Sequence, residues 1–301
     1  MFRKLLTKPV WWWERHRTYP MRFRFDRLPP VAVQEAAKRF EVLTTAAAFK
    51  DALWTAWSWY RYLHSQGFEL QFAVDGKITQ AEDSAARRLF PGVRINGVES
   101  LIADFGVSHP ALDNFLQLHP LGKKLCVLLA LSQQSGFLYC DHDVLAFNSP
   151  DEMSEFAEKE TPLYLEEEQD GSLDPDIVER ARSLGLEYIS RLNSGLLYVP
   201  QGALSPDLAA QLLENWRPPM TSWYTEQAVL SVLMFQAHAT PLPASRYVVS
   251  NRRQFYWEKD VDYSAIAARH FTGTVRHVMY SKGMPEVLRQ ARSFLKEREN
   301  V

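Results

Sequence analysis

The chain has 301 residues, of which 46% are apolar, and a formal net charge of −2 at pH 7. This length and apolar content suit one large α/β domain with a sizeable core, and they do not require a disordered segment. The charge argues against a surface that is basic throughout, so we expect no nucleic-acid partner.

The cysteines and the apolar runs indicate a cytoplasmic protein. Cys126 and Cys140 both lie within apolar runs, which favours two buried small hydrophobes over a disulfide or a metal site. The stretch at residues 125–131 is far shorter than the roughly 18–20 residues that span a bilayer. The N-terminal segment also lacks the apolar core and cleavage site of a signal peptide.

The first 30 residues differ in composition from the rest, and residues 1–39 are predicted to form an N-terminal arm ahead of a single domain at residues 40–301. Residues 1–27 interleave cations with aromatic side chains, a composition that suits contact with lipid headgroups. Prolines prevent one continuous amphipathic helix there. The favoured interpretation is an arm packed on its own domain or on a partner subunit, and peripheral membrane contact through residues 1–27 is the alternative.

From residue 40 onward, short β-like runs alternate with helix-like segments, which is typical of an α/β domain. The predicted strands are 41–45, 68–74, 93–95, 136–140, 162–165 and 196–199. The predicted helices are 49–60, 81–89, 98–105, 110–118, 121–131, 225–235 and a C-terminal helix that begins near Pro285. The aromatic stripe of the first helix is expected to be core, and the strand at 68–74 is expected to be half-buried.

The strongest local signal follows the apolar strand at 136–140. Two carboxylates, Asp141 and Asp143, come one residue apart where that strand ends, and apolar chain resumes at once. Ligands of open parallel sheets bind at the carboxyl ends of strands. Mg²⁺ and Mn²⁺ take hard oxygen ligands and share them with substrate phosphates. We therefore expect a divalent metal here; the alternative is that the carboxylates cap the following turn.

Four short segments, in this order, carry a family resemblance. Residues 138–145 resemble the strand and DxD motif of GT-A-fold glycosyltransferases, particularly the glycogenin and bacterial lipooligosaccharide galactosyltransferase group. Residues 191–197 resemble that group's Asn-x-Gly strand, and residues 226–227 resemble its Asp-Gln pair at a helix start. Residues 270–276 resemble its C-terminal His-x-x-Gly-x-x-Lys motif. The resemblance implies a Rossmann-like GT-A fold with a central, mostly parallel mixed sheet flanked by helices.

The resemblance also implies how the donor is held. Asp141, Asp143 and His270 would bind Mn²⁺ or Mg²⁺, and Asp141 would also lie at the nucleotide. Gly273 would let the backbone approach the diphosphate, and Arg276 would pair with it. Arg276 stands where the family has Lys, which keeps the charge and changes the geometry. A histidine such as His270, taken alone, is more often a core or surface residue than a ligand, and its spacing to Gly273 and Arg276 favours the metal site.

The resemblance implies that Asn193, Glu226 and Gln227 are the catalytic residues and face the transferred sugar. It also implies that the anomeric configuration is retained without an enzyme nucleophile. Glu226 replaces the family's Asp and is one methylene longer. The alternatives are that Asn193 serves a turn and that Glu226 favours a helix N-terminus. The acidic run at residues 166–168 is expected to be a solvated loop, with a carboxylate that lines the site as the alternative.

The N-terminal strand ends are expected to meet the donor nucleoside. Thr44 and Thr45 end the first strand, and Asp75 ends the second, where a carboxylate can accept hydrogen bonds from base or ribose. Lys123 or Lys124, one helix ahead of the DxD strand, is expected to approach the donor. UDP is the nucleotide that the resemblance implies, and the acceptor is left open.

Two other functions remain as alternatives to a glycosyltransferase. A metal-dependent nucleotidyltransferase would need a glycine-rich, basic loop after the first strand, and residues 46–50 do not provide one. A non-catalytic GT-A-like protein would bind a nucleotide sugar or a protein partner without transfer. Motifs of P-loop, dinucleotide-binding, zinc-protease and serine-hydrolase proteins are absent from the sequence.

Overall fold

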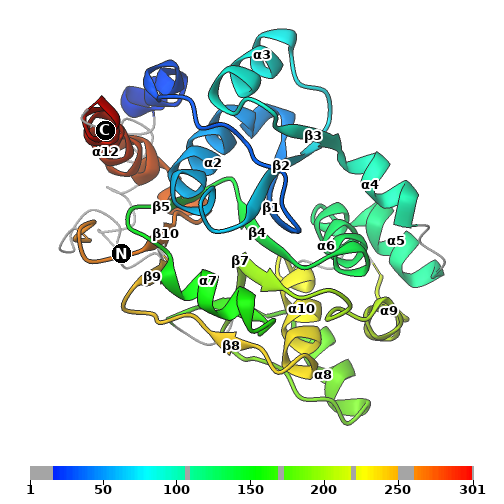
Figure 1. The fold of residues 1–301 in the computed structure, drawn as a ribbon. Helices are drawn as coiled ribbons and strands as arrows, with labels where there is room; N and C mark the ends of the chain where they lie inside the picture. Colours follow the sequence, from blue (N-terminus) through cyan, green and yellow to red (C-terminus); the bar gives the residue numbers. More distant parts are fainter. Residues whose placement is uncertain (1–15, 106–108, 169–172, 218–221, 250–260, 300–301) are drawn as a thin grey trace, which may run out of the picture.

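The computed structural model describes residues 16–105, 109–168, 173–217, 222–249 and 261–299 (Figure 1). Its strands are β1 Lys38–Thr45, β2 Phe68–Asp75, β3 Arg94–Gly97, β4 Phe137–Asp141, β5 Val144–Ala146, β6 Leu163–Glu166, β7 Leu192–Val199, β8 Thr240–Pro241, β9 Tyr247–Val249 and β10 Ala268–His270. Its α-helices are α2 Phe49–Leu63, α3 Gln80–Leu89, α4 Val98–Phe105, α5 Pro110–Leu118, α6 Gly122–Gln134, α7 Asp151–Glu158, α8 Pro175–Ser183, α9 Pro206–Leu213, α10 Thr225–Gln236, α11 Arg276–Val278 and α12 Met284–Glu299. Three further segments are 3₁₀-helices: η1 Tyr19–Arg27, η2 Ala46–Ala48 and η4 Gly273–Val275. The segment η5 Met279–Gly283 is a π-helix.

The central sheet is mostly parallel, as predicted. Its order is β3-β2-β1-β4-β7-β6-β8. Strands β3, β2, β1 and β4 run parallel, whereas β7 lies antiparallel between β4 and β6. A second sheet has the order β5-β10-β9, and β10 pairs antiparallel with β5 just beyond the end of β4. The carboxyl ends of the parallel strands and the small sheet therefore meet at one edge.

Both faces of the sheet are covered, which corrects the prediction that β2 is half-buried. Every residue from Phe68 to Val74 is buried. Phe72 belongs to the core cluster that contains α2, and its neighbour Ala73 belongs to the cluster that contains α6 and α10. These helices lie on opposite sides of the strands in Figure 1. Strands buried on both faces usually read as continuous apolar runs, but β2 keeps the polar residues Glu69 and Gln71, and both are buried.

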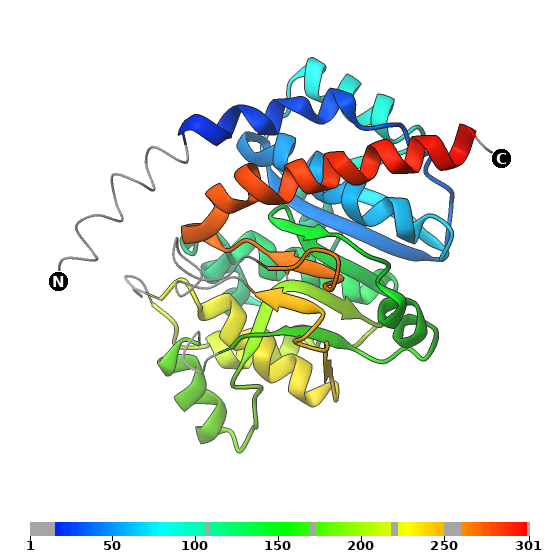
Figure 2. The same ribbon diagram turned by 90° about the vertical axis from the view of Figure 1, so that its left-hand side faces the viewer.

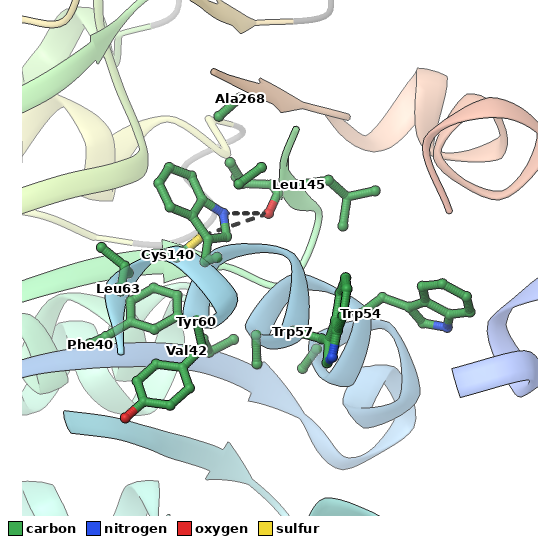
Figure 3. Close-up of a cluster of buried hydrophobic side chains, with 14 of the residues drawn as sticks. Phe40, Val42, Trp54, Trp57, Tyr60, Leu63, Cys140, Leu145 and Ala268 are labelled. Carbon is green, nitrogen blue, oxygen red and sulfur yellow. Dashed lines mark hydrogen bonds between the residues drawn. The ribbon is translucent and has the colours of Figure 1, made fainter. Parts of the chain in front are cut away.

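The aromatic stripe of α2 is core, as predicted. Trp54, Trp57 and Trp59 are fully buried, and Figure 3 shows labelled side chains of this helix beside those of β1. Each indole N–H donates to a backbone carbonyl: Trp54 to Arg22 at 3.1 Å, Trp57 to Pro29 at 2.8 Å and Trp59 to Val144 at 3.0 Å. A buried indole usually finds such a partner. These bonds tie α2 to the N-terminal segment and to the small sheet.

The described part of the predicted N-terminal arm packs on the domain. Leu28 and Val31 belong to the main core, and Arg22 is buried. Arg22 donates through Nε to Asp51 Oδ1 at 3.0 Å, and Tyr280 donates to the other oxygen of Asp51 at 3.0 Å. In Figure 2, η1 and α12 run along the same side of the domain. Residues 1–15 of the arm lie outside the described residues.

Two further expectations can be compared with the structure. Cys126 and Cys140 are buried free thiols, as predicted. Among the described residues, no helix is both long and apolar enough to cross a bilayer.

Candidate active site

Three potential metal ligands gather at the carboxyl edge of the central sheet. Asp141 ends β4, and Asp143 is the second residue of the two-residue turn that leads into β5. His270 ends β10 and lies in register with Val144 of β5, the residue next to Asp143. One ligand atom from each of Asp141, Asp143 and His270 lies within 4.8 Å of the other two. The pairing of β5 with β10 therefore brings together residues that are almost 130 positions apart in the chain.

The charges around Asp143 favour its ionised form. Its carboxylate lies 3.2 Å from His270 Nε2, and its other oxygen accepts two hydrogen bonds from the Arg276 guanidinium. Burial by itself would raise the pKa of Asp143, but Arg276 and His270 outweigh burial and hold that pKa well below its usual value. Burial by itself would lower the pKa of His270. The nearby Asp143 carboxylate outweighs burial, so the pKa of His270 is raised.

The donor set fits a hard divalent cation. Two carboxylates and one imidazole suit Mn²⁺ or Mg²⁺, and a ligating histidine normally donates its other ring N–H to an oxygen. His270 meets this condition because its Nδ1 lies 2.8 Å from Asn193 Oδ1, which leaves Nε2 facing Asp143. The ring is only 7% exposed, so its orientation is fixed by packing as well.

Asn193 reaches His270 because β7 carries a bulge. Tyr164 pairs with Leu197, but the next residue of β6, Leu165, pairs with Asn193. One step along β6 thus corresponds to four steps along β7, and the additional residues bend the strand at the site. This corrects the prediction that the strand begins at residue 196, because Asn193, Ser194 and Gly195 lie inside a strand that starts at Leu192.

Gly195 forms the surface on which His270 lies. A Cβ at this position would come within 2.4 Å of His270 Cε1 and 2.5 Å of His270 Nδ1. Since non-bonded carbon atoms need roughly 3.5 Å, only glycine leaves room for the ring. The Asn-x-Gly segment therefore serves His270 twice: Asn193 contacts its ring nitrogen, and Gly195 leaves space for its ring.

Lys124 is the cation at the centre of a second, buried group of residues. Its Nζ donates to Asp141 Oδ2 at 3.2 Å and to Ser194 Oγ at 3.0 Å, and it lies 3.4 Å from Glu226 Oε1. Burial would lower the pKa of Lys124, but the two carboxylates outweigh burial and raise it. The pKa of Glu226 is raised, mainly by burial, and the nearby ammonium of Lys124 limits the rise. Lys124 thus joins Asp141, a potential metal ligand, to the residues expected near the sugar.

Gln227 and Ser194 complete this group. Gln227 Oε1 accepts from the Ser194 backbone N–H at 3.1 Å, and Ser194 Oγ donates to Glu226 Oε2 at 3.2 Å. Both α10 residues are buried. Ser194 is a site residue that the motif comparison passes over, because its role depends on the bulge in β7. Tyr139, whose hydroxyl donates to Asp141 Oδ1, is another.

The predicted nucleoside contacts line the same edge further along the sheet. Thr45 pairs with Asp75 in the β1–β2 register, two residues beyond the pair formed by Leu43 and Asp141. Asp75 accepts from Lys123 Nζ at 2.6 Å, and Thr44 Oγ1 donates to the carbonyl of Thr45 at 3.1 Å. Lys123 and Lys124 therefore diverge, the first toward the end of β2 and the second toward the metal ligands.

Gly273 and Arg276 follow His270 on η4 and α11. Gly273 is exposed, and a Cβ there would meet nothing within 4 Å. The pKa of the Arg276 guanidinium is raised because it faces the Asp143 carboxylate. This arrangement places a cation and an open stretch of backbone at the edge of the sheet that carries Asp141, Asp143 and His270.

The acidic run after β6 departs from the prediction of a solvated loop. Glu166 pairs with the Arg191 guanidinium, and Glu167 Oε1 accepts from Asn193 Nδ2 at 2.6 Å. Glu167 is partly buried. The sequence left a carboxylate that lines the site as an alternative, and Glu167 is that carboxylate because the β6–β7 pairing sets it beside Asn193.

Comparison with solved structures shows which fold this is. Mouse xyloside xylosyltransferase 1 is similar with a TM-score of 0.53 and 11% identity, over 81% of this chain and 99% of that one. The galactosyltransferase LgtC, solved with donor and acceptor sugar analogs, has a TM-score of 0.51 and 14% identity, over 85% and 95%. The bifunctional glycosyltransferase WbbM has a TM-score of 0.57 and 10% identity, over 85% of this chain and 51% of that one. No family model and no curated protein matches the sequence. The predicted GT-A fold is confirmed.

Proposed function

We propose that the protein is a metal-dependent glycosyltransferase that moves a hexose-type sugar from a nucleotide-diphosphate donor, a UDP-sugar, to an acceptor. The observation that carries this proposal is the Asp141, Asp143 and His270 cluster at the carboxyl edge of a GT-A sheet. Fold alone does not define an activity, so the proposal rests on the chemistry of this cluster and of its neighbours.

Each residue would have a role that its surroundings favour. Asp141, Asp143 and His270 would hold Mn²⁺ or Mg²⁺, which when bound supplies a Lewis acid for the departing diphosphate. Arg276, now paired with Asp143, would add a second positive charge for that diphosphate. Gly273 would let the backbone approach the phosphates, because the space around its Cα is open.

The residues at the sugar are proposed to act by position and charge. Glu226 and Gln227 would face the transferred sugar from the first turn of α10, and Lys124 keeps the Glu226 carboxylate near a cation. Asn193 would act beside them through His270. Thr44, Thr45 and Asp75 would meet the nucleoside at the ends of β1 and β2. Retention of anomeric configuration follows from the family resemblance and stays a prediction.

The N-terminal segment is proposed to contact an anionic membrane surface. Within the described residues 16–27, Phe23 is 50% exposed, and Arg24 and Arg27 are exposed on the same short helix. An exposed aromatic ring beside cations suits a lipid interface. Location in the cytoplasm, which the sequence predicts, stays a prediction.

The experiment that tests the function is a calorimetric titration with UDP, GDP and dTDP, each with Mn²⁺ and again with a chelator. The expected result is that UDP binds in the presence of Mn²⁺ and that GDP and dTDP do not bind. One UDP-sugar is then expected to be hydrolysed or to donate its sugar. Metal-dependent binding of UDP without turnover of any sugar would favour the non-catalytic alternative. In a parallel titration with nucleoside triphosphates, metal-dependent binding with release of pyrophosphate would favour the nucleotidyltransferase alternative.

A further inference from the structure

The side-chain amide of Asn193 is held at both ends, by partners that differ in kind. Its Oδ1 accepts from the Gly195 backbone N–H at 3.0 Å, and its Nδ2 donates to Glu167 Oε1 at 2.6 Å. A backbone N–H can only donate, and an ionised carboxylate can only accept. The two contacts therefore fix which end of the amide is oxygen and which is nitrogen.

The fixed amide in turn fixes the protonation of His270. Asn193 Oδ1 lies 2.8 Å from His270 Nδ1, so that ring nitrogen must carry a proton to make a hydrogen bond. Nε2, which faces Asp143 at 3.2 Å, is then the nitrogen whose lone pair could bind a metal ion. If the amide of Asn193 turned over, its Nδ2 would face Nδ1 and favour the tautomer that keeps a proton on Nε2.

Glu167 can accept from the Asn193 amide because its neighbour Glu166 pairs with the Arg191 guanidinium. Glu166 pairs with Arg191, and the backbone N–H of Glu167 donates to the Arg191 carbonyl at 2.7 Å. The chain is thereby anchored at the end of β6. The Glu167 side chain is partly buried and directed to Asn193.

We propose that Glu167 is a positioning residue of the metal site, which orients the amide of Asn193 and through it keeps His270 Nε2 available to a divalent cation. This inference rests on the proposed function, in which His270 is a metal ligand. It extends the site by one residue that neither the sequence motifs nor the fold assigns.

The test measures Mn²⁺ alone, with no nucleotide, by the electron paramagnetic resonance signal of the free ion. Loss of an outer-shell partner typically weakens metal affinity by about 10- to 100-fold. Glu167 is one hydrogen bond further from the metal site than Asn193, and in the variant the Gly195 N–H still donates to the amide oxygen of Asn193. For Glu167→Ala we therefore expect a dissociation constant raised by about three- to tenfold. Glu167→Gln should stay within about twofold of the wild type, because the Gln carbonyl oxygen can still accept from Asn193 Nδ2.

Glu166→Gln is the matched control, since it neutralises the adjacent carboxylate, which pairs with Arg191. It should leave Mn²⁺ affinity unchanged. Wild-type affinity in Glu167→Ala would overturn the proposal. Equal loss in Glu167→Gln and Glu167→Ala would also overturn it, because the carboxylate would then act by its charge and not by holding the amide.

A second readout does not need the metal. The ¹⁵N chemical shifts of the His270 ring report which nitrogen is protonated, and His270→Asn identifies the signal. We expect the wild type and Glu167→Gln to share these shifts and Glu167→Ala to differ from both. If the wild type bound no Mn²⁺, the proposed function would fail, and these shifts would still decide whether Glu167 positions His270.

Discussion

The ring of His270 lies directly against Gly195, so closely that a Cβ there would come within 2.4 Å of the ring. Gly195 is on a bulged strand of the central sheet, and His270 ends a strand of the small sheet. The glycine thus leaves room for the two sheets to approach closely at the proposed metal ligands. Substitution of this one residue tests whether the position of His270 matters for metal binding.

We expect Gly195→Ala to displace His270. Overpacking of this kind typically costs about 1–3 kcal/mol of stability, and Mn²⁺ affinity should fall by at least about tenfold because the third ligand moves. Urea unfolding and Mn²⁺ titration measure the two effects. Gly97→Ala is the control, since its Cβ would meet only Glu99 Oε2 at 3.9 Å. Unchanged Mn²⁺ affinity in Gly195→Ala would show that His270 is not a ligand.

Removal of the ligands should separate their contributions to donor binding. Asp143→Ala is expected to abolish metal-dependent UDP binding, because Asp143 is buried and central among the cations of the site. His270→Ala should weaken it, because two carboxylates remain. Calorimetry with UDP and Mn²⁺ makes the comparison. Wild-type affinity in both variants would rule out this metal site.

Lys124 and Lys123 form a natural pair for testing burial. Lys124→Met leaves the buried carboxylate of Glu226 and the partly buried carboxylate of Asp141 without their cation, and breaking a buried pair typically costs about 3–5 kcal/mol. Lys123→Met removes ion pairs in which the lysine is 39% exposed, and such pairs contribute about 0–1 kcal/mol. Chemical denaturation of both variants at pH 7 gives the comparison. Equal losses would contradict the assignment of Lys124 to the interior of the site.

Glu41 should make stability depend on pH. This residue of β1 is fully buried, its carboxylate oxygens have no hydrogen-bond partner among the described residues, and burial raises its pKa from 4.5 to about 8. Between pH 4.5 and about 8, Glu41 keeps its proton in the folded state and loses it in the unfolded state. The free energy of unfolding therefore falls as the pH rises through this range.

Substitution of Glu41 should remove the loss of stability that accompanies the rise in pH. The pKa difference corresponds to an effect on the order of 5 kcal/mol at most, so Glu41→Gln is expected to be more stable than the wild type at pH 9 and much closer to it at pH 5. Urea unfolding at both pH values tests this. Glu158→Gln, at an exposed position, is the control. A pH dependence that survives Glu41→Gln would place its origin elsewhere.

Charge reversal on η1 tests the proposed membrane contact. Arg24→Glu combined with Arg27→Glu should reduce flotation of the full chain with vesicles that contain anionic lipid, because each basic residue near such a surface contributes about 1 kcal/mol. Arg182→Glu combined with Arg217→Glu reverses the same charge at exposed positions outside η1. Equal flotation of the two double variants, or flotation that does not depend on anionic lipid, would remove the basis for this contact.

Much of the fold follows from local patterns in the sequence. The strand that ends at Asp75, the aromatic face of α2 and the strand that leads into Asp141 are visible because apolar runs and helical spacing reflect burial directly. The extent of burial is less visible. Glu69 and Gln71 make β2 look solvated on one side, yet both are buried because helices cover that face too.

The site divides in the same way. The sequence by itself determined the types of side chain at the proposed metal site, since Asp141, Asp143 and His270 stand in motifs whose chemistry is local. Only the tertiary structure decided how they are held: that Lys124 rather than Lys123 meets Asp141, that Asn193 orients His270, and that Glu167 holds Asn193. These contacts depend on the bulge in β7 and on the β5–β10 pairing, and strand pairing joins residues whose separation in the chain carries no signal of their contact.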